Sequence, residues 1–300
     1  MSIEKNMARN SGRRKLFDAN MDNNIGLGVQ REGEQIMTKD KYGFLPTSVW
    51  HVTKTKELVA MVDDKIGGGS FSKNGKKKKQ GQENLSLFNP DVARRIIAYY
   101  SNPNDFVVAP FNSRGVWSII GNMLGRNVHS GDVVRTYVED TKERLDCIKA
   151  SPNYNGRELE VFISDARHSV FESDKYDLLV ASPPYWDVEK YESTEGQLSD
   201  IGTYESFLED YFECIKDHYR ITKPGGFAVY VVNDFRRNGE FIPFSYDTVR
   251  LFREAGFVYH DCIINVLNSR SVASIGQIEQ KGSKIMAKSH EFIHVFKKPL

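Results

Sequence analysis

Cysteine is scarce in this chain: three of its 300 residues are cysteines, and they lie far apart. Cys147, Cys214 and Cys262 match no metal-ligand spacing. We interpret them as buried thiols of a protein from a reducing compartment, rather than as metal ligands or a catalytic nucleophile. A metal cofactor is therefore not expected.

Long apolar runs and a strong excess of one charge are also missing. No stretch approaches the roughly 20 apolar residues that cross a bilayer, and the basic segment 1–15 lacks the apolar core of a secretory signal. We therefore expect a cytoplasmic protein without a membrane partner. The net charge is only +1, so any surface for nucleic acid has to be a local cluster of basic residues.

The first 84 residues lack regular periodicity. We expect 1–40 to be a mobile N-terminal segment and 41–84 to be an extension with a Gly- and Lys-rich loop. The apolar patch 44–52 is expected to pack on the main domain. The loop holds the clearest basic cluster, which is either a solvated segment or a contact for phosphate groups. Its residues are Lys76, Lys77, Lys78 and Lys79.

From residue 85 to the end, strand-like apolar runs alternate with helical segments. This alternation predicts an α/β domain over 85–300, with a mostly parallel sheet and helices on both faces. Ligands bind such sheets at the carboxyl ends of the strands, so the residues after each strand are the candidate site. Strands are expected at 106–108, 127–129, 159–163, 178–180, 227–232, 258–267 and 291–296. Helices are expected from Asn89 and over 117–124, 135–149, 204–221 and 247–255.

Small and polar residues follow the first three of these strands. The turn 109–115 lets the backbone approach a ligand closely. Asp132 lies where carboxylates hold the ribose hydroxyls of nucleotide-like ligands, and Asp165 could accept a hydrogen bond from an adenine amino group. Each also has an ordinary explanation, namely a tight turn, an exposed loop carboxylate or a helix cap.

The segment after the fourth strand, Ser182-Pro183-Pro184-Tyr185, is the most specific signal. Its two prolines fix the backbone and remove two N–H donors, so that carbonyl groups remain free to accept beside the Ser182 hydroxyl. Tyr185 adds a flat ring for stacking, and Trp186 follows it. These groups suit a planar aromatic amine, with one acceptor for each amino hydrogen. A plain Pro-Pro turn at a strand end is the alternative.

In this order, residues 108–115, Asp132, Asp165 and 182–185 resemble the cofactor and catalytic motifs of the amino-group DNA methyltransferases, the cytosine-N4 and adenine-N6 class. The resemblance implies a seven-stranded, Rossmann-like S-adenosylmethionine-dependent methyltransferase fold. It also implies S-adenosylmethionine as cofactor, DNA as partner, and extrusion of the target base from the duplex.

The strongest likeness is to the DNA methylases of phages and prophages. These share an acidic and aromatic stretch after the catalytic loop, here 187–191, and a final strand like 290–296. The likeness implies a location in the cytoplasm of a bacterium or a phage-infected host cell. A homodimer is a further partner hypothesis. Target recognition would fall to the first 80 residues or to the stretch 268–289, with Arg270, Gln277 and Gln280 as candidate base readers.

The resemblance also implies a role for each motif residue. Ser182 and a carbonyl of Pro183 or Pro184 would accept the amino hydrogens. Tyr185 would stack on the base beside Trp186, and the lysines at 76–79 would contact the DNA. The cofactor would be held by Phe88, Asn89, Pro110, Phe111, Asn112, Ser113, Gly115, Asp132, Val133, Asp165 and Ala166.

Three residues of the first motif depart from the family pattern. Ala109 stands where the family usually has Asp, and Ser113 and Arg114 occupy small or glycine positions. These departures leave open a degenerate scaffold that serves as a DNA-binding or partner subunit. A methyltransferase acting on RNA or on a glutamine amide is another alternative. Ser182, in place of Asp, favours cytosine-N4 over adenine-N6 as the target.

Overall fold

The structure is a computed structural model that describes residues 42, 44, 46–63, 88–152, 154–189, 191–267, 284–286 and 288–300. The predicted mobile segment 1–40, the basic cluster 76–79 and most of the stretch 268–289 lie outside these residues, and so do Arg270, Gln277 and Gln280.

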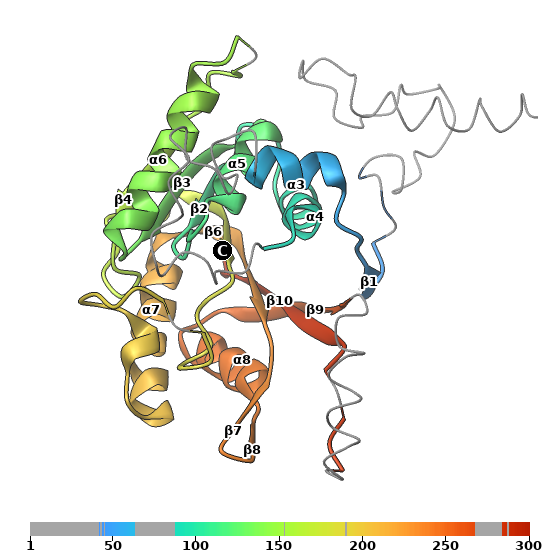
Figure 1. The fold of residues 1–300 in the computed structure, drawn as a ribbon, viewed down its shortest axis with the longest axis vertical. Coiled ribbons are helices and arrows are strands. Elements are labelled where there is room, and N and C mark those ends of the chain that lie inside the picture. Colours follow the sequence, from blue (N-terminus) through green and yellow to red (C-terminus); the bar gives the residue numbers. More distant parts are fainter. Residues whose placement is uncertain are drawn as a thin grey trace, which may run out of the picture.

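Within the described residues, eight strands form one sheet in the order β1-β9-β10-β6-β5-β2-β3-β4 (Figure 1). The strands β4, β3, β2, β5 and β6 run parallel, and β10 is antiparallel between β6 and β9. The bounds are β1 (Val49–His51), β2 (Phe106–Ala109), β3 (Asn127–Asp132), β4 (Leu159–Ile163), β5 (Tyr176–Ala181), β6 (Thr222–Val232), β9 (Val258–Val266) and β10 (His290–Lys297).

The predicted mostly parallel, Rossmann-like sheet is confirmed, but the predicted number of seven strands is wrong. Val49–His51 adds an eighth strand, because it pairs in parallel with β9 at the sheet edge. This three-residue strand is too short to give a recognisable alternation in the sequence. Its Trp50 is only 3% exposed, which confirms that the apolar patch 44–52 packs on the main domain.

Helices cover both faces of the sheet, as predicted. The helices α3, α4, α5 and α6 share one hydrophobic core with the sheet, and α7 and α8 share the other. Figure 1 shows α3, α4 and α5 together on one side and α7 and α8 on the other. The bounds are α3 (Lys56–Asp63), α4 (Pro90–Tyr100), α5 (Val116–Met123), α6 (Arg135–Lys149), α7 (Tyr204–Ile221) and α8 (Phe244–Glu254), with a short 3-10 helix η1 (Leu198–Asp200).

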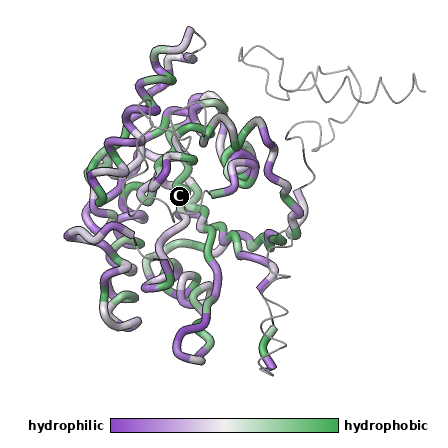
Figure 2. Tube along the Cα trace, in the orientation of Figure 1, coloured by the Kyte–Doolittle hydropathy of each residue, from purple (hydrophilic) through white to green (hydrophobic). Residues whose placement is uncertain are grey.

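Alternate residues of the central strands face opposite cores. In β2, Val107 and Ala109 pack against α4 and α5, whereas Val108 faces the core of α7 and α8. Because both faces are covered, the central strands are continuous apolar runs, and Figure 2 shows hydrophobic colouring along them. This property made these strands recognisable in the sequence.

The strand order reverses between β2 and β5. After β2 the chain builds β3 and β4 on one side, and β5 then returns to the other side of β2. The loops after β2 and β5 therefore diverge at the carboxyl edge and leave a crevice between them, which is where open α/β sheets bind ligands. The turn 109–115 and the loop 182–186 lie at this point.

The sequence prediction missed the hairpin of β7 (Phe235–Arg237) and β8 (Glu240–Ile242). Asn238 and Gly239 connect the strands with φ values of 50° and 87°. Two positive φ values define a type I′ turn, for which Asn-Gly is the preferred sequence. The dipeptide was therefore a usable signal.

Candidate functional site

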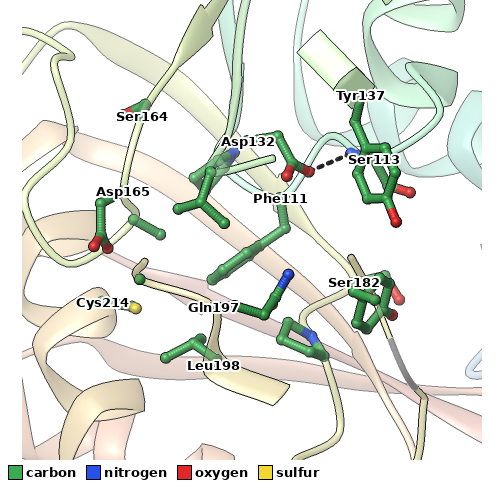
Figure 3. Close-up of a pocket in the computed structure, with 16 residues that line it drawn as sticks. Phe111, Ser113, Asp132, Tyr137, Ser164, Asp165, Ser182, Gln197, Leu198 and Cys214 are labelled. Atoms are coloured by element: carbon green, nitrogen blue, oxygen red, sulfur yellow. Dashed lines mark hydrogen bonds between the residues drawn. The ribbon is translucent and has the colours of Figure 1, made fainter. Parts of the chain in front are cut away.

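A pocket opens at the carboxyl ends of β2, β3, β4 and β5 (Figure 3). Its empty space is about 530 Å³, a figure that includes solvent at its open mouth. The structure brings nine of the predicted site residues together in its wall. They are Pro110, Phe111, Ser113, Asp132, Val133, Asp165, Ala166, Ser182 and Pro184.

The turn after β2 has a left-handed backbone at Ser113, with φ 42°, and at Gly115, with φ 77°. Glycine adopts such angles without strain, whereas serine does so at a modest cost. Ser113, one of the departures from the family pattern, therefore keeps the shape that a glycine would give. Asn112 lies behind the turn: its side-chain Oδ1 accepts from Ser118 at 3.1 Å, and its N–H donates to Gly131 O at 2.9 Å.

Asp132, the last residue of β3, ties this turn to the next one. Its Oδ2 accepts from the Ser113 N–H at 2.9 Å, as Figure 3 shows, and its Oδ1 accepts from the Val134 N–H at 3.0 Å. Burial raises the pKa of the carboxyl to about 6, although these backbone donors act against the rise. A carboxylate has about four acceptor sites, so the backbone donors leave capacity for a further hydroxyl group.

Asp165, after β4, is held by Arg167. Arg167 donates to it from Nη2 at 2.6 Å and from Nε at 3.1 Å, and reaches Asp210 of α7 at 2.5 Å. Burial raises the pKa of Asp165, but its hydrogen bonds with Arg167 and the charge of that guanidinium outweigh burial, so the pKa lies below its usual value. The carboxylate is therefore ionised and fixed in position, with Ala166 beside it in the pocket wall.

Two of the catalytic-loop candidates line the pocket, and the half-buried Tyr185 directly follows them in the chain. Ser182 and Pro184 line the pocket. Tyr185 donates its OH to Val231 O at 3.4 Å and packs its ring 5.7 Å from that of Phe244. Burial raises the pKa of Tyr185, so the phenol stays neutral at physiological pH.

Trp186 holds the loop in place from a left-handed backbone, with φ 50°. Its Nε1 donates to Ile201 O at 2.8 Å, and its ring lies 5.7 Å from that of Tyr204. A non-glycine residue in this region is uncommon and is held by its surroundings. Trp186 is thus anchored to the segment before α7, and it does not line the pocket.

Two further predicted cofactor residues lie at the start of α4. Asn89 caps this helix, because its Oδ1 accepts from the Asp91 N–H at 3.0 Å. The ring of Phe88 lies 4.4 Å from that of Trp117. The predicted site residues outside the pocket wall are Phe88, Asn89, Asn112, Gly115, Pro183, Tyr185 and Trp186.

The segment 191–198 closes one side of the pocket, and sequence reasoning had not assigned it a site role. The Glu192 N–H donates to the Tyr137 OH at 3.2 Å, and Thr136 Oγ1 donates to Glu192 Oε2 at 2.7 Å. The acidic and aromatic residues at the start of this segment were the sequence signal that could have indicated a role in the site. The unpredicted lining residues are Tyr137, Ser164, Tyr191, Gly196, Gln197, Leu198 and Cys214.

The cysteine prediction holds only in part. Cys214 is fully buried in α7, where it reaches the pocket wall. Cys147 is exposed, however, and Cys262 is partly exposed. The buried face of α6 includes Arg144 and Leu145, and Cys147 lies two residues further along, off that face. The prediction of a buried thiol was wrong for Cys147.

The described residues include no group of three or more His, Cys, Asp or Glu side chains placed to hold a metal ion. Among the same residues, no helix combines the length and apolar character needed to cross a membrane.

The fold and the pocket define a class: an α/β protein with a pocket at the switch point of its sheet. The cyclase SpnF has the same fold, with 13% identity and a TM-score of 0.50 over 81% of this chain and 94% of that one. An S-adenosylmethionine-dependent methyltransferase from Methanosarcina mazei matches at 15% identity and a TM-score of 0.48, over 72% of this chain and all of that one.

Residues 176–299 match the sequence profile of the N6/N4 DNA methylase family. The chain is also 33% identical over 88 residues to the orphan methyltransferase M.BamHII of Bacillus amyloliquefaciens. That match takes in 29% of this chain and spans 28% of the length of M.BamHII. The predicted resemblance to the amino-group DNA methyltransferases is thereby confirmed. The narrower likeness to phage and prophage enzymes stays a prediction.

Proposed function

We propose that this protein is an S-adenosylmethionine-dependent DNA methyltransferase that modifies the exocyclic amino group of an extruded base. One observation carries the proposal: a single pocket joins Ser182 and Pro184 to the turn 110–113, to Asp132 and to Asp165. An acceptor pair suited to an amine thus opens onto a site suited to a nucleoside-like cofactor. The match of residues 176–299 to the DNA methylase family supports DNA as the substrate.

The chemistry of the residues that line the pocket suits the cofactor. Asp132 would accept a hydrogen bond from a ribose hydroxyl, since its backbone donors do not fill all of the acceptor sites of the carboxylate. Apolar surface from Phe111, Val133 and Leu198 suits a purine ring. Asp165 and the backbone of Ala166 lie next to this surface and would hold the adenine edge. When bound, the cofactor supplies an electrophilic methyl group.

The catalytic loop would position the amine. The Ser182 hydroxyl and a Pro-Pro carbonyl would each accept one amino hydrogen, which leaves the nitrogen lone pair directed toward the cofactor side of the pocket. Most of the rate enhancement would come from this alignment. The half-buried Tyr185 ring, fixed by Phe244 and Val231 O, would form the wall on which the base stacks.

Cytosine-N4 is the proposed target atom. Ser182 places a neutral hydroxyl at the head of the loop, the form that resembles the cytosine-N4 enzymes. The base would have to leave the duplex, because its amino group is paired there, at a cost of a few kcal/mol.

Transfer of a radiolabelled methyl group from S-adenosylmethionine tests this proposal. Duplex DNA, an RNA transcript and a glutamine-containing peptide would be compared as acceptors under the same conditions. Label on DNA alone is the expected result. Label on the RNA or on the peptide would identify that molecule, and not DNA, as the substrate. If none of the acceptors is labelled although calorimetry shows that the cofactor binds, the binding-only alternative is favoured.

A further inference from the structure

The β7–β8 hairpin projects from the carboxyl edge that carries the catalytic loop. It begins directly after β6 and, in Figure 1, extends away from the sheet beside α8. Its two-residue turn, Asn238-Gly239, is a tight type I′ turn, so the tip is a short and well-defined structure. Figure 2 shows hydrophilic colouring at the tip.

The root of the hairpin is packed, whereas its tip is not. Phe235 is 7% exposed and lies against the rings of Tyr204 and Phe244, at 6.1 and 6.2 Å. The Ser245 N–H donates to Asp234 Oδ1 at 2.9 Å and fixes the exit toward α8. The root of the hairpin is therefore held by its own contacts with α7 and α8.

A half-exposed aromatic ring of β8 has two cations close to it. Phe241 is 50% exposed. The guanidinium of Arg236 lies 5.5 Å from the ring centre, and the ammonium of Lys288 lies 5.6 Å from it. Arg236 also donates a hydrogen bond from Nη1 to Gly239 O at 3.2 Å. An aromatic ring flanked by cations suits a nucleic-acid strand, in which bases alternate with phosphates.

The hairpin is also tied to the catalytic loop. Arg237 forms an ion pair with Asp187, which directly follows Trp186. The tip and the loop that would receive the base are therefore parts of one connected surface.

We propose that Arg236, Phe241 and Lys288 hold duplex DNA beside the extruded base. The two cations contact backbone phosphates, and Phe241 packs against the nucleotide between them. This inference rests on the proposed function, because it names the surface that the DNA substrate would use. Phosphate contacts position the duplex without reading its sequence, so the tip contributes to affinity more than to target choice.

Fluorescence anisotropy with a fluorescein-labelled duplex at several salt concentrations tests the proposal. The double variant Arg236→Ser/Lys288→Ser should bind at least tenfold more weakly, and its salt dependence should flatten by about 0.9 for each phosphate that the protein no longer neutralises. Phe241→Ala should weaken binding about fivefold and leave the salt slope unchanged. Thermal unfolding confirms that the variants are folded.

Lys216→Ser is the matched control, because Lys216 lies 5.2 Å over the ring of Phe212 on α7 and thus repeats the same pairing away from the hairpin. It should bind DNA as the wild type does. A loss of affinity in Lys216→Ser that is as large, per charge removed, as that in the double variant would overturn the proposal, since the effect would then be one of total charge.

A parallel methyl-transfer assay separates this inference from the proposed function. Tip variants that bind and methylate DNA like the wild type would overturn the hairpin surface and leave the enzyme assignment intact. Hairpin-dependent binding without methyl transfer would support the surface and refute the activity. A wild-type protein that binds no duplex would overturn the hairpin surface outright.

Discussion

Acidification should release the cofactor through protonation of Asp132. Burial raises the pKa of this carboxyl to about 6, and the proposed hydrogen bonds from ribose hydroxyls require its charged form. Between pH 7 and pH 5 the ionised fraction of such a group falls about tenfold. The affinity for S-adenosylmethionine should therefore fall by about the same factor.

This loss of cofactor affinity at low pH is not caused by unfolding, because protonation of Asp132 affects the stability of the folded protein in the opposite direction. The folded-state pKa of Asp132 lies above the value of 3.8 for an unperturbed Asp. Asp132 therefore contributes stability that is fully present below about pH 4 and is lost as the pH rises through about 6. Protonation of Asp132 thus stabilises the free protein while it weakens cofactor binding.

Isothermal titration calorimetry with S-adenosylmethionine from pH 5 to pH 8 measures the effect. Asp132→Asn is the control: it should bind about tenfold or more weakly at pH 7.5, since a charge-assisted hydrogen bond is worth about 1.5–3 kcal/mol. Its affinity should not change with pH in this window. A wild-type affinity that is flat from pH 5 to pH 8, or a variant with the same pH dependence as the wild type, would refute the reasoning.

Two further predictions concern the walls of the pocket. Gly196→Ala should destabilise the fold by about 1–3 kcal/mol and weaken cofactor binding, because the residue has φ 87° and a Cβ would come within 2.7 Å of Asp165 Oδ2. Thermal unfolding measures the loss of stability. Gly202→Ala is the control, because a Cβ at that position would meet nothing within 4 Å. Tyr185→Ala should lower kcat at least tenfold and Ser182→Ala by less, with cofactor affinity within about twofold of wild type in both. Steady-state kinetics measures kcat, and calorimetry measures the affinity for the cofactor. A normal kcat in a folded Tyr185→Ala variant would contradict this prediction.

The sequence was most informative where one residue type fits one place in the fold. The strands β2 and β5 and the second half of β6 are buried on both faces and stand out as apolar runs. The ends of the predicted strands then located the turn 109–115, Asp132, Asp165 and Ser182 without knowledge of the strand order. Parallel strands bring their carboxyl ends to one edge, and the structure does place these residues in one pocket.

The structural features that could not be predicted from the sequence depend on contacts between segments that are distant along the chain. β1 has three residues and becomes a strand only because β9 is beside it. Trp186 was expected to face the base, but its bond to Ile201 O directs the ring toward α7. The role of Gly196 depends on its contact with Asp165. No local pattern encodes such contacts.

The identity of the modified nucleoside decides whether this protein methylates DNA, and at which atom. Wild-type protein would be incubated with duplex DNA and S-adenosylmethionine, the DNA digested to nucleosides, and the products separated by mass spectrometry. N4-methylcytosine is the predicted product, and it should be absent when Ser182→Ala/Tyr185→Ala replaces the wild type. N6-methyladenine would contradict the choice of base, and the absence of any methylated nucleoside, with S-adenosylmethionine shown to bind, would contradict the assignment as a DNA methyltransferase.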